Sequence, residues 1–136
     1  MTIRYLEGIL PSPRDVLALY RANGWSSAEK PDLLLAALAG SHHLVTAHAG
    51  DRLVGLANAI SDGHLVVYYP HLIVHPDRQG QGIGRGLMAR MRARYRDMHQ
   101  HMLVAEGNAV GFYQRMGFER AGQTVAMWIY EGGDHG

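Results

Sequence analysis

The residues best suited to chemistry in this sequence lie in a glycine-rich segment, residues 73–85, which reads Ile-Val-His-Pro-Asp-Arg-Gln-Gly-Gln-Gly-Ile-Gly-Arg. Glycine lets a backbone turn sharply and approach a ligand closely. A helix that starts after such a loop offers unpaired N–H groups and the positive end of its dipole. Arg78 and Arg85 flank the loop, and guanidinium groups suit phosphate. The segment therefore predicts a phosphate or pyrophosphate site.

Two well-known phosphate loops do not fit this segment. A Walker A loop needs a lysine after its second glycine, and the one lysine of the chain is Lys30. A dinucleotide loop that started at Gly80 or Gly82 would need its third glycine where Arg85 or Leu87 stands. The glycines instead occupy alternate positions. Because a strand, the loop and an amphipathic helix follow in order, a loop without a role is the less favoured interpretation.

Apolar periodicity predicts the elements that position this loop, in a mixed α/β order. Pro70 lies inside one long predicted strand, and proline cannot donate to a ladder, so we expect a bulge or an interruption there. Residues 1–131 are expected to form a single domain, and residues 132–136 a frayed tail. The predicted strands are 2–6, 43–49, 53–60, 65–75, 100–105 and a last hairpin of 118–120 with 124–130; the predicted helices are 13–22, 30–38, 83–95 and 108–116.

Composition narrows the class of protein. The chain has 136 residues, 47% of them apolar, and a formal net charge of +1, which argues against a protein that wraps nucleic acid. It has no cysteine, so a disulfide framework, a thiolate metal site and a cysteine nucleophile are excluded. We expect no metal, since His99 and His101 lack a third ligand. No apolar run approaches the roughly 18 residues that a membrane span needs, and the N-terminus lacks the layout of a signal peptide, so we expect a cytoplasmic protein without membrane contact.

Two sequence blocks carry a family resemblance. The stretch from Gln79 to Gly84 fits the Q/R-x-x-G-x-G/A signature of the GNAT superfamily of acyl-CoA N-acyltransferases. A second block, Phe112-Tyr113 before Gly117-Phe118, resembles that family too, and the similarity covers nearly the whole chain. The resemblance implies an α/β GNAT fold, with a mixed, mostly antiparallel central sheet, a splayed pair of parallel central strands and about four flanking helices.

The same resemblance implies a binding site for acetyl-CoA as co-substrate. The backbone of Leu72, Ile73 and Val74 would bind the pantetheine arm. The family often has an asparagine seven residues before the tyrosine of the second block, but here Glu106 stands there and Asn108 is displaced by two. Glu106 would contact the cofactor, cap the helix or face the acceptor. The residues implied for the pyrophosphate are Gln79, Gly80, Gln81, Gly82, Ile83, Gly84 and Arg85.

Catalytic roles follow from the resemblance and from the chemistry of acyl transfer. Tyr113 matches a tyrosine that resembles a general acid for the departing thiolate. The acceptor amine must lose a proton, and histidine titrates in the right range. His71 on the central strand is the first candidate base, His101 on the neighbouring strand the second and Glu106 the third, while some relatives use only a water chain.

The acceptor is expected to be a primary amine of a small molecule. The parts of the chain that would face it hold aromatic residues, which suit an aryl-alkyl amine or a cation over a ring, as in arylalkylamine-type relatives. A peptide or protein amine, a non-catalytic acyl-CoA sensor and an unrelated phosphate-binding module are the alternatives. The exposed final hairpin could pair strands in a homodimer. The aromatic residues are Trp25, Tyr68, Tyr69, Trp128 and Tyr130.

Overall fold

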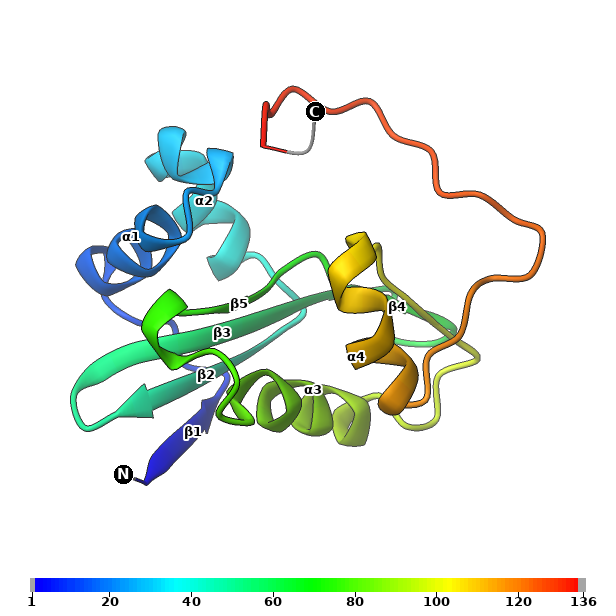
Figure 1. Ribbon diagram of the computed structural model, residues 1–136, viewed down its shortest axis with the longest axis horizontal. Coiled ribbons are helices and arrows are strands. Elements are labelled where there is room, and N and C mark those ends of the chain that lie inside the picture. Colours follow the sequence, from blue (N-terminus) through cyan, green and yellow to red (C-terminus); the bar gives the residue numbers. More distant parts are fainter. Residues whose placement is uncertain (1, 135–136) are drawn as a thin grey trace.

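The computed structural model describes residues 2–134, which form a six-stranded, mostly antiparallel sheet with helices on both faces (Figure 1). The strands run in the order β1-β2-β3-β4-β6, and β5 pairs with β3. The mixed α/β order, the parallel pair and the four α-helices agree with the prediction. The strands are β1 Ile3–Glu7, β2 His43–Ala49, β3 Arg52–Ser61, β4 Val66–Tyr68, β5 Leu72–Val74 and β6 Gln100–Met102. The α-helices are α1 Pro13–Ala22, α2 Pro31–Ala39, α3 Ile83–Arg94 and α4 Val110–Arg115, and short 3-10 helices are η1 Ser26–Glu29, η2 Pro76–Arg78 and η3 Gly107–Ala109.

Helices α1 and α2 cover one face of the sheet. Helix α1 begins where the sequence predicts, because the Ser12 side chain accepts a hydrogen bond from the Asp15 backbone and Pro13 fixes the first turn. Its apolar residues and those of α2 pack on alternate side chains of β2 and β3. The buried residues of this layer include Val16, Leu19, Tyr20, Leu34, Leu38, Leu44, Leu53 and Leu56.

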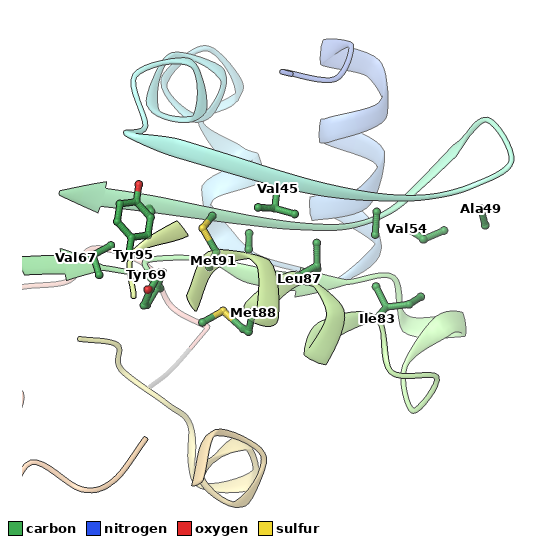
Figure 2. Close-up of a cluster of buried hydrophobic side chains, with 13 residues drawn as sticks. Val45, Ala49, Val54, Val67, Tyr69, Ile83, Leu87, Met88, Met91 and Tyr95 are labelled. Carbon is green, nitrogen blue, oxygen red and sulfur yellow. The ribbon is translucent and has the colours of Figure 1, made fainter. Parts of the chain in front are cut away.

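Helix α3 covers the opposite face (Figure 2). The predicted apolar face of α3 is confirmed, since Leu87 and Met91 are fully buried against the sheet, together with side chains such as Val45 and Val54. Arg92, the residue after Met91, is half-buried. Its guanidinium donates to the Met116 carbonyl, which ties α3 to the end of α4.

Two glycines let the layers approach closely. A Cβ at Gly55 on β3 would lie 3.0 Å from the side chains of Ile83 and Leu87. A Cβ at Gly86 on α3 would collide with the Tyr5 side chain, and the neighbouring Arg90 guanidinium sits 3.8 Å above the Tyr5 ring. Glycine at these positions therefore seats α3 directly on the sheet.

The long strand predicted at 65–75 is interrupted at Pro70, as expected. Before the proline, β4 pairs with β6 in parallel; after it, β5 pairs with β3 in antiparallel register. The last contact across the parallel pair runs from the Tyr69 N–H to the Met102 carbonyl, 3.0 Å away. Pro70 has no N–H to continue this ladder, so the two neighbouring segments separate from there.

The predicted last hairpin, 118–120 with 124–130, is wrong. Residues 119–134, here called the C-terminal arm, form no strand; they leave α4 as an extended segment and return near η1 (Figure 1). The continuous apolar run of 125–129 is typical of a strand, but in this fold the arm forms no strand among the described residues. Of the predicted tail 132–136, Asp134 contacts Ser26, and residues 135–136 lie outside the described range.

Candidate active site

A cleft of about 970 Å³ opens where the strands separate after Pro70. Its walls are Tyr69 to Leu72 on one side and Val104 to Glu106 on the other. The separation of these two segments corresponds to the splayed pair of strands that the resemblance implied. The cleft, here called the splayed cleft, is also lined by Tyr113 from α4, by η1 and by the end of the C-terminal arm.

Strand β5 directs part of its backbone toward this opening. The Asn58 N–H donates to the His71 carbonyl and the His75 N–H to the Val54 carbonyl, so backbone groups of alternate residues from 71 to 75 face β3. By the alternation of an antiparallel ladder, the backbone groups of Leu72 and Val74 face the splayed side. Ile73 has its backbone toward β3 and its side chain buried.

The glycine loop follows β5 and leads into α3. Gly80 and Gly82 have φ angles of +80° and +81°, and nothing lies within 4 Å of a Cβ built on either one. Gly82 caps α3, and the first backbone bond of the helix runs from the Gly86 N–H to the Gly82 carbonyl, 3.0 Å away. The preceding N–H groups of the first turn have no acceptor within the helix. The loop therefore presents an open, positively polarised helix end.

The two sequence blocks meet in space. A Cβ built on Gly84 would lie 3.5 Å from the Phe112 ring, so the start of α3 packs next to α4. Tyr113 follows Phe112, and its ring packs edge-on against Phe112 and Phe118 with centroids 5.0 and 5.9 Å apart. Burial raises the pKa of Tyr113 to about 12, so its hydroxyl keeps its proton at neutral pH.

His71 lines the splayed cleft and is held from behind. Its Nδ1 lies 2.8 Å from the Tyr20 hydroxyl, and its backbone N–H donates to Asn58 Oδ1 at 3.0 Å. The Trp25 indole packs edge-on against the imidazole, with centroids 5.3 Å apart. Burial lowers the pKa of His71 below its usual value, so the ring is neutral at pH 7. A neutral imidazole beside a cleft can accept a proton.

His101 lies beside this cleft without lining it. Its Nδ1 is 2.8 Å from the Tyr69 hydroxyl, and the two rings are stacked with centroids 6.0 Å apart. Burial, and then the nearby Arg92 charge, lower the pKa of His101. Because Tyr69 belongs to the cleft wall, the second candidate base reaches the opening through a tyrosine.

Glu106 and Asn108 lie at the short helix η3 before α4, and they differ in their position relative to the splayed cleft. Glu106 lines the splayed cleft and stands at the N-cap of η3, where its carbonyl accepts from the Ala109 N–H at 2.8 Å. Asn108 is exposed and is not among the residues that line the cleft. Among the described residues, no group of three or more His, Asp or Glu side chains is arranged to hold a metal ion.

The predicted aromatic residues gather on the cleft, although the hairpin that was to carry two of them does not form. Trp128 and Tyr130 stack on each other with centroids 4.6 Å apart and line the cleft together with Trp25 and Tyr68. The arm is fastened across the opening, since the Tyr130 hydroxyl lies 3.0 Å from Ser26 Oγ. Lys30 and Glu131 form an ion pair at 3.2 Å, and Asp134 accepts from the Ser26 N–H.

Two positioning residues were missed from the sequence. Tyr20 lies on the apolar face of α1 and is fully buried, and its hydroxyl contacts His71. Asn58 lies in the middle of an apolar strand and orients the backbone of His71. A buried tyrosine hydroxyl and a buried amide both need hydrogen-bond partners. The sequence therefore indicates that each of these side chains has a partner, but it does not identify that partner.

Comparison with known proteins agrees with this architecture. Residues 16–128 match a family model described as an acetyltransferase (GNAT) domain. A solved structure of the GNAT-family acetyltransferase SP0256 from Streptococcus pneumoniae is 34% identical, with a TM-score of 0.83, and the alignment covers 96% of this chain and all of that one.

Curated relatives are similar over part of their length. A soybean protein named histone acetyltransferase TAP1 is 30% identical over 77% of this chain and 51% of its own length. A rice protein named serotonin N-acetyltransferase 2, chloroplastic is 38% identical over 49% of this chain and 34% of its own length. The matched segments span between 27% and 51% of the curated relatives they match. No helix formed by the described residues is long and apolar enough to cross a bilayer.

Proposed function

The chain belongs to the GNAT family of acetyltransferases, and we propose that it transfers an acetyl group from acetyl-CoA directly to the primary amine of a small molecule. One observation carries the proposal: His71 and Tyr113 line the same cleft, which opens after Pro70, where the chain leaves the parallel pairing of β4 with β6. In the reaction the amine nitrogen bonds to the acetyl carbonyl carbon, the carbon–sulfur bond breaks, and the amine loses a proton while sulfur leaves as thiolate.

The residues present fit acetyl-CoA as substrate. The outward backbone groups of Leu72 and Val74 can bond an extended pantetheine amide chain, as an added strand would. The open loop around Gly80 and Gly82, with the first turn of α3, can receive the pyrophosphate on backbone N–H groups. Arg85 is exposed in that turn and adds positive charge.

Tyr113 would act on the leaving sulfur by donating a hydrogen bond. Its pKa of about 12 lies above that of an ordinary thiol, about 8.5, so complete proton transfer to the thiolate is uphill. A phenol that never ionises in the working range still offers its hydrogen throughout. We therefore assign Tyr113 the stabilisation of developing charge on sulfur, with protonation completed as CoA leaves.

His71 would accept the proton of the amine. Burial keeps its ring neutral, and Tyr20 fixes the ring orientation through Nδ1, which leaves Nε2 as the other basic nitrogen. His101 is the less direct candidate, because it meets the cleft only through Tyr69. Glu106 lines the cleft and, as an exposed carboxylate, is suited to attracting an ammonium group.

The acceptor that the cleft supports best is an aromatic or aryl-alkyl amine. Trp25, Trp128 and Tyr130 supply ring faces near the mouth. An aromatic acceptor can stack there, and an ammonium group is stabilised over an indole face. The similarity to a protein named serotonin N-acetyltransferase supports this choice.

A protein amine is the second candidate, favoured by the similarity to a protein named histone acetyltransferase. Against it, the arm crosses the mouth of the cleft and is fastened to η1 by Ser26 and Lys30. A crossing of this kind leaves more room for a compact amine than for an extended polypeptide.

A panel of amines tests the proposal. We would follow release of CoA with a thiol reagent, to which this cysteine-free chain contributes no background. The expected result is turnover with arylethylamines at a kcat/KM well above that for alkylamines of equal length and for lysine-bearing peptides. Turnover with peptides alone would establish the second candidate. A rise in Tm with acetyl-CoA but no turnover with any amine would indicate an acyl-CoA sensor.

A further inference from the structure

Helix α4, which carries Tyr113, is too short to hold this residue in place by itself. It has six residues, Val110–Arg115, and they are half-buried or exposed. Isolated helices shorter than about 12 residues are marginal in water, so a helix of this length is positioned by its contacts with other elements. The position of Tyr113 therefore depends on what α4 is tied to at its two ends.

The first of these ties is the contact of Phe112 with Gly84 at the start of α3. The second lies in the turn 116–118, which closes on Tyr113 itself. The backbone N–H groups of Met116 and Phe118 both donate to the Tyr113 carbonyl at 3.0 Å. Because both bonds end on that carbonyl, a shift of the turn 116–118 moves the backbone of Tyr113 with it.

Arg92 holds the turn 116–118 from α3. Its guanidinium donates to the Met116 carbonyl and lies 5.2 Å from the centroid of the Phe118 ring. Gly117, with φ of +95°, brings the turn close, since a Cβ there would lie 3.3 Å from Nη1 of Arg92. One side chain of α3 thus contacts the whole turn, and α4 is tied to α3 at both of its ends (Figure 1).

Packing alone does not require an arginine at position 92. The Nε atom of Arg92 is buried and has no hydrogen-bond partner among the described residues. An unpaired buried donor lowers the stability of a fold, and an apolar side chain of similar length would avoid this loss. Departures of this kind concentrate where a residue serves function. The contacts that the guanidinium makes with the turn 116–118 are therefore the reason to look for its role there.

The charge of Arg92 acts on other groups than Tyr113. Burial lowers the pKa of His101, and the charge of Arg92 lowers it further. Burial raises the pKa of Tyr69, and the same charge opposes that rise. For Tyr113, burial is the cause that raises the pKa to about 12. The link between Arg92 and Tyr113 is therefore one of position.

We propose that Arg92 is a positioning residue for Tyr113, because it holds the turn 116–118 against α3 and so fixes where the Tyr113 hydroxyl stands in the splayed cleft. The inference rests on the role proposed for Tyr113 at the leaving sulfur. Arg92 itself is not among the residues that line the cleft. Its loss should therefore lower kcat through Tyr113 and leave the affinity for acetyl-CoA nearly unchanged.

A double-mutant cycle on kcat tests this link. Arg92→Met keeps an unbranched side chain and removes the guanidinium, and we expect kcat to fall by about tenfold in the native background. In the Tyr113→Phe background the same substitution should cost little further rate, because the hydroxyl that it displaces is already absent. If Tyr113→Phe is slow and Arg92→Met lowers kcat by the same factor in both backgrounds, the positioning role is overturned. If Tyr113→Phe keeps the native kcat, the role proposed for Tyr113 fails, and the positioning role fails with it.

Arg90 provides the matched control on the same helix. Its guanidinium also donates to a backbone carbonyl, that of Gly86, and also lies over a ring, that of Tyr5 on β1. Arg90→Met should leave kcat unchanged. An equal loss of kcat in Arg90→Met and Arg92→Met would contradict the proposal, because the effect would then belong to any arginine of α3.

Hydrogen exchange gives a readout that does not depend on activity. The amides of Met116 and Phe118, which donate to Tyr113, should exchange faster in Arg92→Met than in Arg90→Met, after correction for global stability measured by denaturant unfolding. Unchanged exchange at both amides would show that Arg92 does not hold the turn and would overturn the proposal.

Discussion

The Tyr20 hydroxyl lies 2.8 Å from Nδ1 of His71, and this contact joins the core of α1 to the wall of the splayed cleft. For Nε2 of His71 to take a proton from an amine, the neutral ring must carry its hydrogen on Nδ1 and donate it to the tyrosine oxygen. Tyr20 can accept that bond both before and after the transfer. The same tyrosine therefore serves packing on one side and the orientation of a base on the other.

The pH dependence of turnover should reveal His71. Because burial lowers its pKa from 6.5, the neutral, active form predominates at pH 7 and is lost as the pH falls through the lowered pKa. With a weakly basic acceptor, kcat/KM should fall only below pH 6.5. His71→Gln should remove this acid limb and reduce the rate. His99→Gln, at an exposed histidine, should change neither. An unaltered limb in His71→Gln would assign it to another group.

Replacement of Tyr113 should separate chemistry from binding. Tyr113→Phe removes the hydrogen that stabilises the leaving sulfur, and we expect kcat to fall by about a hundredfold. The affinity for acetyl-CoA, measured by calorimetry, should change little because the ring stays packed against Phe118. Tyr68→Phe alters another cleft tyrosine and should affect the acceptor KM more than kcat. If kcat survives in Tyr113→Phe, that residue does not act on the thiolate.

A substitution in the glycine loop should weaken the binding of acetyl-CoA in addition to lowering the stability of the protein. Gly82→Ala forces an alanine to a φ of +81°, at a cost of about 1–2 kcal/mol. Gly63→Ala places the same strain, φ of +78°, in the turn between β3 and β4, at the end of β3 opposite to the part that pairs with β5. Denaturant unfolding should give similar losses for both. Calorimetry with acetyl-CoA should show weaker binding in Gly82→Ala alone, and equal affinities would remove the loop from the site.

Replacement of Gly86 by alanine should lower the stability of the protein, whereas glycine-to-alanine substitutions inside helices usually raise it. Alanine in place of glycine inside a helix commonly adds up to about 1 kcal/mol of stability. At Gly86 the added Cβ would meet the Tyr5 ring, so we expect a loss of about 1–3 kcal/mol in the free energy of unfolding. The double variant with Tyr5→Ala should show a smaller cost for the added methyl group. Gly111→Ala on α4 has ordinary contacts and should be neutral or stabilising. If Gly86→Ala is as stable as the native protein, Tyr5 and β1 move to make room for the added methyl group.

The parts of the site that depend on local sequence could be predicted. Glycine at positions 80 and 82 has φ values that other residues rarely adopt, and Pro70 cannot continue a ladder, so each residue type constrains the backbone where it stands. The strand interruption and the loop before α3 follow from such constraints, whereas the clustering of the aromatic residues was predicted from the family resemblance. The second motif, at Phe112, was predicted from the same resemblance, and the structure places Phe112 of α4 next to Gly84.

The parts that depend on contacts distant in sequence could not. Tyr20 and His71 are 51 positions apart, and no periodicity links a helix tyrosine to a strand histidine. The arm failed as a hairpin prediction for a related reason. The apolar run from Val125 to Ile129 describes a segment able to pair, whereas pairing needs an edge within reach. The sequence pattern indicates whether a segment can form a strand, and the fold determines whether a strand partner is available.

Strand β3 holds both walls of the splayed cleft. It pairs with β5 through residues 55–57 and with β4 through residues 60–61, and β4 in turn carries β6. The angle between the two walls therefore depends on the twist of β3, a strand of ten residues that pairs with β4 and β5. Substitutions along β3, remote from any bound molecule, can retune the width of the cleft. The protein can thus change which acceptor fits without altering the residues that do the chemistry.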